Sequence, residues 1–363
     1  MKKHNNKGQT TRPCGYPEGC TVGLDVSDDY TYAAVVSESG ELLVEDRFPT
    51  REPAVRRWLS AGAGAVVALE TGTHSRWMAK VARECGHRVI VANARELRLI
   101  YSGTNKTDRV DAVKLARLAR VDPELLKPVR QRGDREQADL AVIGARELLV
   151  KMRSEAINLV RGIVKSNGSR VAACASTSFT RWAGEVLPAG LRNALAPMLE
   201  QIDELSDRIQ EYDERIEHLA LTRYPEAALL KQVTGVGTLT ALTFLLTIGD
   251  PARFERSRDV GCFIGLRPKR DQSGERDPRL GITKAGDARL RRTLVHCAHY
   301  ILGPFGPDCD LRRWGLRLAE GGNKKKAIIA VARKLAVLLH RLWTTGEVYE
   351  PLRNAGRQQT KAA

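Results

Sequence analysis

Between residues 21 and 121, short apolar runs, turn residues and amphipathic segments alternate in an order that few folds accept. Three apolar runs come first and are separated only by turns, which predicts a meander of antiparallel strands. Two more apolar runs follow, and an amphipathic helical segment precedes each of them. A strand that is reached through a helix is expected to join its sheet in parallel. The order β-β-β-α-β-α-β-α therefore predicts an α/β domain over residues 21–133. The five runs are TVGLDV, YTYAAVVS, ELLVEDRF, AVVALE and HRVIVAN.

A longer repeat occupies residues 134–222. Apolar residues from Leu191 to Leu219 recur at steps of three and four, which is typical of a coiled-coil seam or of a long packed helix. The segment from Asp134 to Asn167 is a suitable partner helix. We therefore expect an antiparallel coiled-coil hairpin, which serves either as a spacer or as a contact between subunits.

Residues 223–346 are expected to form a mostly helical C-terminal domain. Gly235 and Gly237 lie in a G-V-G sequence between two helical runs, which resembles a helix-hairpin-helix. In that motif the glycine turn lets backbone N–H groups approach a phosphate. The alternative is a tight turn between helices. The polar ends, residues 1–20 and 347–363, are expected to be a disordered arm and a disordered tail.

The charge of the chain indicates a polyanionic partner. There are 59 Lys and Arg residues against 43 Asp and Glu, a formal net charge of +16. Nucleic acid is the favoured partner. An anionic membrane surface is the alternative, but no segment resembles an apolar anchor or a signal peptide. The seven cysteines contain no C-x-x-C pair, so reduced thiols in a cytoplasm are expected.

Four carboxylates occupy positions that need an explanation. Asp25 and Glu70 lie in apolar strand segments, where an unpaired buried charge is costly. Asp108 and Asp111 are three residues apart in a helical segment, so they share one face and repel each other. The ends of strands and one face of a helix can meet at the same edge of a sheet. Four carboxylates there suit two Mg²⁺ (or Mn²⁺) ions, which can activate a phosphodiester.

The pair in the helix has a simpler explanation. Asp108 favours a helix N-terminus through the helix dipole, and Asp111 pairs with a nearby Lys or Arg. The carboxylates in the two strands make the metal site the stronger prediction.

The motifs that carry these carboxylates resemble those of a known family. VGLDVS, ALETGTHS and KTDRVDA together resemble the D-E-D-D signature of a family of insertion-sequence transposases. The N-terminal domain of that family is similar to the RuvC resolvases and has a ribonuclease-H-like fold. The block from Gln232 to Val295 resembles the family's second domain, so the resemblance covers residues from about 21 to 343.

The resemblance implies that Ser273, in DQSGERD, is a nucleophile that attacks DNA. Many relatives carry two small hydroxyl residues followed by two glycines. Here Gln272 precedes Ser273, and Gly274 is followed by Glu275. A neutral serine needs activation, and neither His nor Lys adjoins it in the sequence. Without the resemblance, this segment would be interpreted as a solvated turn.

The residues around the serine and the acidic set complete the predicted site. Basic side chains can grip phosphate and stabilise its extra charge. The residues expected to bind nucleic acid are Lys106, Arg109, Gly235, Gly237, Lys269, Arg270, Arg276, Arg279, Lys284, Arg289, Arg291 and Arg292.

The resemblance also implies partners. They are donor DNA, target DNA and a structured guide RNA, often called a bridge RNA, which pairs with both DNAs. The family works as an oligomer, so a homodimer or homotetramer is expected, in a bacterial cytoplasm and on the nucleoid.

Three functions fit these features. The first is a serine- and metal-dependent transposase or recombinase. The second is a junction-resolving nuclease that uses the acidic set and water. The third is a basic scaffold without activity. The scaffold leaves the carboxylates in the strands unexplained, and the nuclease leaves the basic serine loop unexplained. The first function is therefore the prediction.

Overall fold

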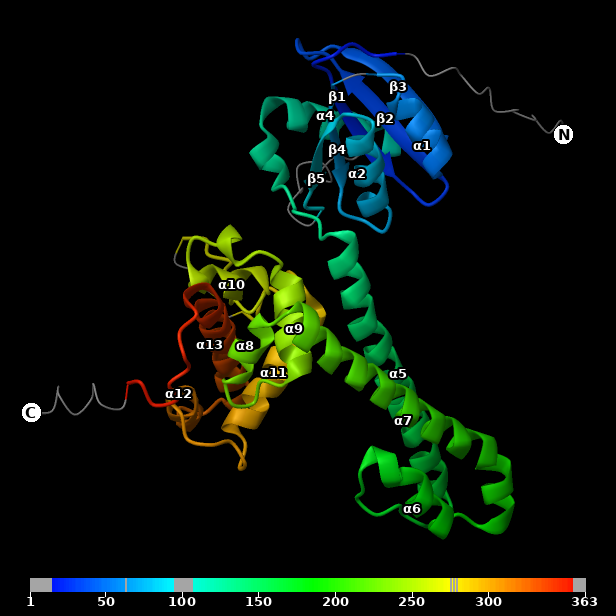
Figure 1. Ribbon diagram of the computed structural model, residues 1–363, viewed down its shortest axis with the longest axis vertical. Helices are drawn as coiled ribbons and strands as arrows, with labels where there is room; N and C mark the ends of the chain where they lie inside the picture. Colours follow the sequence, from blue (N-terminus) through cyan, green and yellow to red (C-terminus); the bar gives the residue numbers. More distant parts are fainter. Residues whose placement is uncertain are drawn as a thin grey trace, which may run out of the picture. The chain divides into compact units, whose positions relative to one another are not determined.

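The chain divides into two compact units, Met1–Gln131 and Arg132–Ala363 (Figure 1). The computed structural model describes residues 15–62, 64–94, 107–274, 276, 278 and 280–354. The division lies close to the end predicted for the α/β domain, whereas the expected hairpin and C-terminal domains belong to one unit. Within the described ranges, no helix is both long and apolar enough to cross a membrane.

A five-stranded mixed sheet organises the first unit. Its elements are β1 Thr21–Val26, β2 Tyr30–Val36, β3 Leu42–Pro49, α1 Glu52–Leu59, β4 Val66–Glu70, α2 Ser75–Glu84, β5 Arg88–Ala92, α4 Asp108–Val121 and the 3-10 helix η1 Pro123–Leu126. The strand order is β3-β2-β1-β4-β5. The first three strands pair antiparallel, while β4 is parallel to β1 and β5 is parallel to β4. The predicted α/β class and the mixed sheet are confirmed.

Helices cover both faces of this sheet. On one face, α1 and α2 share an apolar core with strand residues such as Leu24 and Leu69. On the other face, α4 packs directly on Gly23. A Cβ atom at Gly23 would lie 2.0 Å from the carbonyl oxygen of Ala112 and 2.6 Å from the backbone nitrogen of Ala116. The helix can approach β1 this closely only because position 23 has no side chain.

Gly23→Ala is therefore expected to displace α4 from the sheet. Overlap with backbone atoms cannot be relieved by rotating a side chain, so we expect a destabilisation of about 3 kcal/mol. Thermal unfolding followed by circular dichroism measures it. Gly72→Ala is the matched control, because a Cβ there meets no atom within 4 Å. Equal stability of the two variants would contradict the close packing of α4 on β1.

The N-terminal arm is shorter than expected. Tyr16 and Cys20 are buried against the α1 side of the sheet. The ring of Tyr16 lies 5.5 Å from that of Trp58 between centroids, and the side chain fills space beside Gly62. The expectation of disorder is wrong for residues 15–20, because an aromatic ring and a thiol complete the core there. Residues 1–14, including Cys14, lie outside the described residues.

Two long helices begin the second unit. They are α5 Asp134–Ser166 and α7 Ala189–Arg223, joined through η2 Ser176–Ser178 and α6 Phe179–Val186. Arg146 of α5 pairs with Asp213 of α7, and Arg153 donates to Ser206 at 3.1 Å. The partner numbers fall along α7 as they rise along α5, so the helices are antiparallel. The predicted helical hairpin is present, and its coiled-coil form stays a prediction.

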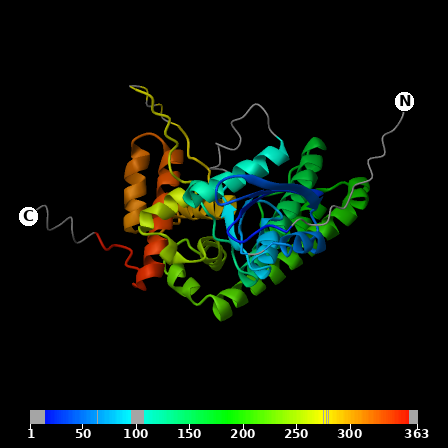
Figure 2. The ribbon, with the colours of Figure 1, turned by 90° about the horizontal axis from the view of Figure 1, so that it is seen from above.

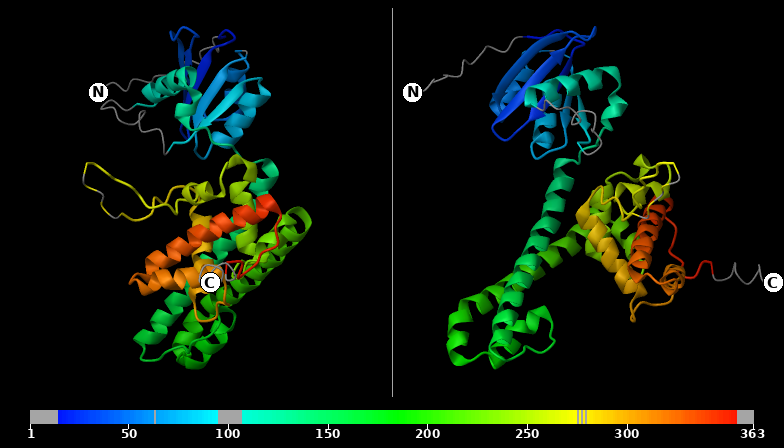
Figure 3. Two further views of the ribbon diagram at one scale, coloured as in Figure 1. Left: turned by 90° about the vertical axis from the view of Figure 1, so that its left-hand side faces the viewer. Right: turned by 180° about the vertical axis from the view of Figure 1, so that it is seen from behind.

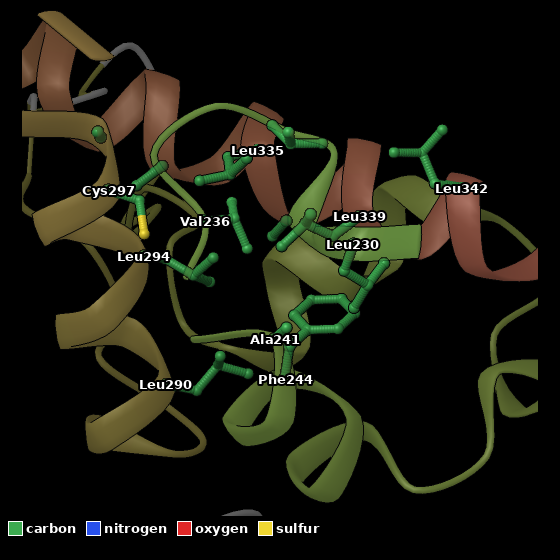
Figure 4. Close-up of a cluster of buried hydrophobic side chains, with 14 of the residues drawn as sticks. Leu230, Val236, Ala241, Phe244, Leu290, Leu294, Cys297, Leu335, Leu339 and Leu342 are labelled. Carbon is green, nitrogen blue, oxygen red and sulfur yellow. The ribbon is translucent and has the colours of Figure 1, made fainter. Parts of the chain in front are cut away.

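The remaining helices form a bundle around one apolar core (Figure 4). They are α8 Glu226–Lys231, α9 Thr238–Ile248, η3 Pro251–Arg253, α10 Ser257–Phe263, α11 Ala288–Leu302, α12 Asp310–Glu320 and α13 Lys324–Thr345. Phe244 of α9 lies at the centre, with Leu294 of α11 and Leu339 of α13 close by. Nearly all of α9 is buried, because its sequence is apolar on every side.

The predicted disordered tail also begins later than expected. The backbone N–H of Tyr349 donates to Oε1 of Gln232 at 2.9 Å, and the backbone N–H of Asp310 donates to the carbonyl of Pro351 at 2.7 Å. These bonds attach residues 347–354 to the bundle, so disorder is wrong for them. Residues 355–363 lie outside the described part of the chain.

Candidate active site

The register of the sheet brings Asp25 and Glu70 to adjacent positions. Leu24 of β1 pairs with Leu69 of β4 in parallel register, and the two acidic residues are the next along each strand. Because side chains alternate along a strand, both lie on the face of Gly23, which α4 covers. Both side chains are partly buried. Two of the predicted carboxylates therefore lie side by side near the ends of neighbouring parallel strands.

The direction of α4 brings its first turn toward the same edge. In the last turn, the guanidinium of Arg120 donates to the carbonyl of Glu38 at 3.1 Å, just beyond the end of β2. Because β2 is antiparallel to β1, this contact lies where β1 begins. The helix thus runs opposite to β1, and its first turn lies toward Asp25. Thr107 caps this turn by accepting a hydrogen bond from the backbone N–H of Val110 at 3.3 Å.

Asp108 and Asp111 both belong to this first turn, but their surroundings differ. Asp108 is exposed, whereas Asp111 is only 7% exposed and faces the sheet. Among the described residues, the Oδ1 atom of Asp111 is buried without a hydrogen-bond partner, and the ammonium of Lys114 is 4.0 Å away. The two groups form an ion pair at this distance, but the distance is too long for a hydrogen bond. A buried polar atom without a partner costs about 1–3 kcal/mol, more for a charged group.

A bound cation would remove the cost at Asp111. Carboxylate oxygens are the ligands that hard divalent ions prefer. In the described part of the chain, however, no three His, Cys, Asp or Glu side chains already lie close enough to hold a metal together. The prediction of Mg²⁺ or Mn²⁺ at Asp25, Glu70, Asp108 and Asp111 therefore depends on the placement of the backbone and on the Asp111 oxygen that lacks a hydrogen bond.

Ser273 lies near the tip of a two-stranded arm. The backbone groups of Ser273 and Arg276 exchange hydrogen bonds of 3.1 and 3.0 Å, and Pro268 bridges to Ile282 near the base. Gly274 has a φ of +56°, which suits glycine at the turn. We call the described residues between 267 and 283 the serine arm; it projects from the helical bundle (Figures 2 and 3). Among the described residues, nothing bonds to the exposed hydroxyl of Ser273.

A second serine has the histidine partner that Ser273 lacks. Oγ of Ser257 lies 3.0 Å from Nδ1 of His340, and Nε2 of the same ring lies 3.0 Å from the carbonyl of Pro251. The carbonyl can only accept, so Nε2 carries the proton and Nδ1 accepts from the serine. His340 is 1% exposed and its ring packs edge-on against Phe254. Because the His340 ring is buried, a DNA phosphate cannot reach it. The Ser257–His340 pair therefore serves to attach α13 to η3 and α10.

Several of the predicted basic residues have partners inside the protein. Arg289 and Arg292 of α11 both pair with Glu147 of α5, and Arg109 of α4 pairs with Glu45 of β3. Arg291 donates to the carbonyls of Ile264 and Ala285 at 2.8 and 2.9 Å. These contacts give the four arginines a structural role, and nucleic-acid binding by them stays a prediction. Of these arginines, Arg109 and Arg292 are nevertheless exposed. Lys269, Arg270, Arg276 and Lys284 are exposed as well, while Lys106 and Arg279 lie outside the described residues.

The G-V-G sequence forms a turn between α8 and α9. Gly235 has a φ of +88°, and a Cβ atom there would lie 2.9 Å from the ring of Tyr300. Gly237 is exposed and directly precedes α9. The left-handed backbone and the close ring explain why Gly235 is a glycine. A helix-hairpin-helix contact with phosphate stays a prediction.

The prediction missed a second group of basic residues, on α12 and α13. Arg317, Lys326, Arg333 and Lys334 line one groove with residues of the serine arm. The signal was available, because Lys and Arg recur seven and eight residues apart along α13, which places them on one face of the helix.

Comparison with known proteins agrees with this architecture. A family described as a transposase family, with the DEDD signature of IS110, matches residues 22–167, and the transposase family IS116/IS110/IS902 matches residues 227–307. The transposase for insertion sequence element IS1111A of Coxiella burnetii is 28% identical over 90% of each chain. The transposase for IS1328 of Yersinia enterocolitica is 26% identical and covers 92% of this chain and 99% of its own. A pilin gene-inverting protein of Moraxella bovis is 26% identical over 74% and 76%.

The α/β unit with its mixed sheet, the helical unit and the relatives named above together identify a DNA transposase. The two family matches follow each other in order and together cover more than half of the residues. The chain belongs to the IS110/IS116 family of DEDD transposases.

Proposed function

We propose that this transposase cuts and rejoins DNA through a covalent bond between Ser273 and the DNA backbone. Oγ of Ser273 attacks the phosphorus and loses its proton, and the bond from phosphorus to the sugar oxygen breaks as that oxygen gains a proton. A hydroxyl from another strand then displaces the serine. The phosphodiester is conserved throughout, so no high-energy cofactor is needed.

The acidic set supplies the second part of this proposal. Asp25, Glu70, Asp108 and Asp111 would hold Mg²⁺ or Mn²⁺, which polarises the phosphate and stabilises charge on the leaving oxygen. The single observation that supports it best is the buried Oδ1 of Asp111. This atom lies toward the edge where Asp25 and Glu70 lie, and it has no hydrogen-bond partner in the described part of the chain. A role in folding alone would favour a satisfied or neutral side chain at position 111.

Strand rejoining is favoured over hydrolysis for two reasons. The serine arm exposes a hydroxyl among basic residues, which a hydrolytic nuclease does not need. One relative carries the name of a gene-inverting protein, and inversion requires that cut ends be rejoined. A nicked suicide substrate separates the two reactions. A recombinase accumulates a DNA–protein adduct that survives boiling in detergent, and a nuclease releases free ends.

A guide RNA and an oligomer belong to the same proposal. The charge of +16 suits a large nucleic-acid load, and the hairpin of α5 and α7 offers a surface for contact between subunits. Sequencing RNA that purifies with the protein tests the first point, and light scattering of the DNA complex tests the second. An RNA-free monomer that still transposes would contradict both.

A further inference from the structure

A groove of about 1840 Å³ lies in the second unit, and all of its lining residues belong to that unit. Its walls come from both strands of the serine arm, from α12 and α13, and from residues 348–354. Among the described residues that line it are thirteen Lys and Arg side chains and two carboxylates, those of Asp310 and Glu350. A concave surface with this charge imbalance attracts a polyanion strongly.

The face of α13 in the groove differs from the face in the core. Leu335 and Leu339 point into the bundle, whereas Lys326, Arg333 and Lys334 lie on the opposite, groove-lining side. Lys326 and Arg333 have no carboxylate partner among the described residues. In contrast, the lining residues Arg313, Arg341 and Arg353 are paired with Asp308 or Glu347. The unpartnered cations are the ones available to a ligand.

The floor of the groove also contains apolar and aromatic side chains, which do not bind phosphate. Ile329 and Leu338 of α13 and Trp314 of α12 line it, and Nζ of Lys334 lies 3.8 Å from the centroid of the Trp314 ring. A duplex presents phosphates outward and hides the faces of its bases. An unpaired strand offers both, and bases stack on aromatic rings in sites of this composition.

We propose that this groove holds one unpaired DNA strand, with its phosphates on Lys326 and Arg333 and a base on Trp314. The choice of DNA rests on the proposed function, because the serine arm forms one wall and Ser273 attacks a DNA phosphate. The groove would thus bind the strand next to the cleaved bond and hold it after the duplex has opened.

The test measures binding without cleavage. Every protein is the full chain carrying Ser273→Ala, and the probe is fluorescein-labelled oligo(dT) of about 16 nucleotides, followed by anisotropy. Lys326→Ala with Arg333→Ala should weaken binding about tenfold or more and lower the log–log salt slope by roughly 1.4, which is about 0.7 for each lost contact with a single strand. Trp314→Ala should weaken binding about tenfold, whereas Trp314→Phe should keep most of the affinity.

Matched controls and further probes decide the outcome. Lys165→Ala with Lys324→Ala removes two cations outside the groove and should leave the slope unchanged, and melting curves confirm that each variant is folded. Wild-type binding by the groove variants would overturn the proposal. If the groove variants lost as much affinity for a paired duplex, the proposal that the strand is unpaired would be wrong. Tighter binding of oligo(rU) than of oligo(dT) would contradict the choice of DNA. The proposed function is tested by a different experiment: it is wrong if the unmutated protein forms no adduct with the suicide substrate.

Discussion

Ser273→Ala is expected to abolish both the DNA–protein adduct and the recombinant product. Loss of a serine nucleophile costs on the order of 10⁶-fold in related chemistry, so the product should fall below detection. The side chain is exposed and makes no hydrogen bond within the described structure, so folding and DNA binding should not change. Denaturing gels with end-labelled suicide substrate, before and after protease, measure the adduct.

Ser257→Ala is the control for this experiment. Ser257 also lies among arginines and has a histidine within hydrogen-bond distance, so by side-chain chemistry alone it is the better candidate. Its partner His340 is buried, and we expect the variant to keep the adduct while unfolding at a lower temperature. Loss of the adduct with Ser257→Ala, and not with Ser273→Ala, would move the active site. Cleavage by Ser273→Ala that releases free ends would make water the nucleophile.

Glu70→Gln and Asp111→Asn are each expected to reduce cleavage about 100-fold or more. Removing a residue that only supports a metal ligand already costs about 10–100-fold, so losing a ligand should cost at least as much. DNA binding should persist, because removing a negative charge from a basic protein does not weaken its attraction to phosphate. EDTA should have the same effect on the unmutated protein. Initial cleavage rates in Mg²⁺ and Mn²⁺ measure the loss.

A readout without DNA distinguishes metal binding from other roles of these carboxylates. A ligand present at 100 times its Kd stabilises the folded state by about 2.7 kcal/mol, so Mg²⁺ should raise the unfolding temperature of the unmutated protein. The two variants should lose this shift. Asp28→Asn is the matched control, because Asp28 lies just beyond β1 at the same edge but is bonded to His74 at 2.9 Å. A full Mg²⁺ shift in Asp111→Asn would contradict the metal site.

The local pattern of the chain predicted most of the fold. Runs such as TVGLDV and AVVALE and the helical segments between them were enough for the order of strands and helices in the first unit. Spacing also revealed α5 and α7, because a buried stripe repeats along the helix that carries it. The failures are at the ends, where Tyr16 and Tyr349 are isolated in polar segments. Their burial depends on partners far away in the chain, which no local period records.

The candidate site divides in the same way. The sequence by itself determined which residues are chemically unusual: carboxylates inside strands, two aspartates on one helical face, and a serine in a basic loop. Only the tertiary structure decided their surroundings. The absent side chain of Gly23 lets α4 lie on β1 and buries one oxygen of Asp111. Glu147 pairs with both Arg289 and Arg292, although Glu147 and Arg289 are 142 positions apart in the sequence.

The groove shows the physical reason for this division. The spacing of residues along α13 indicates that one face of the helix is apolar and that the other face carries both cations and apolar residues. The spacing does not indicate that the serine arm and α12 lie opposite that second face. Burial, ion pairing and the shape of a cavity depend on contacts between segments distant in the chain. These properties therefore exist only once the chain has folded.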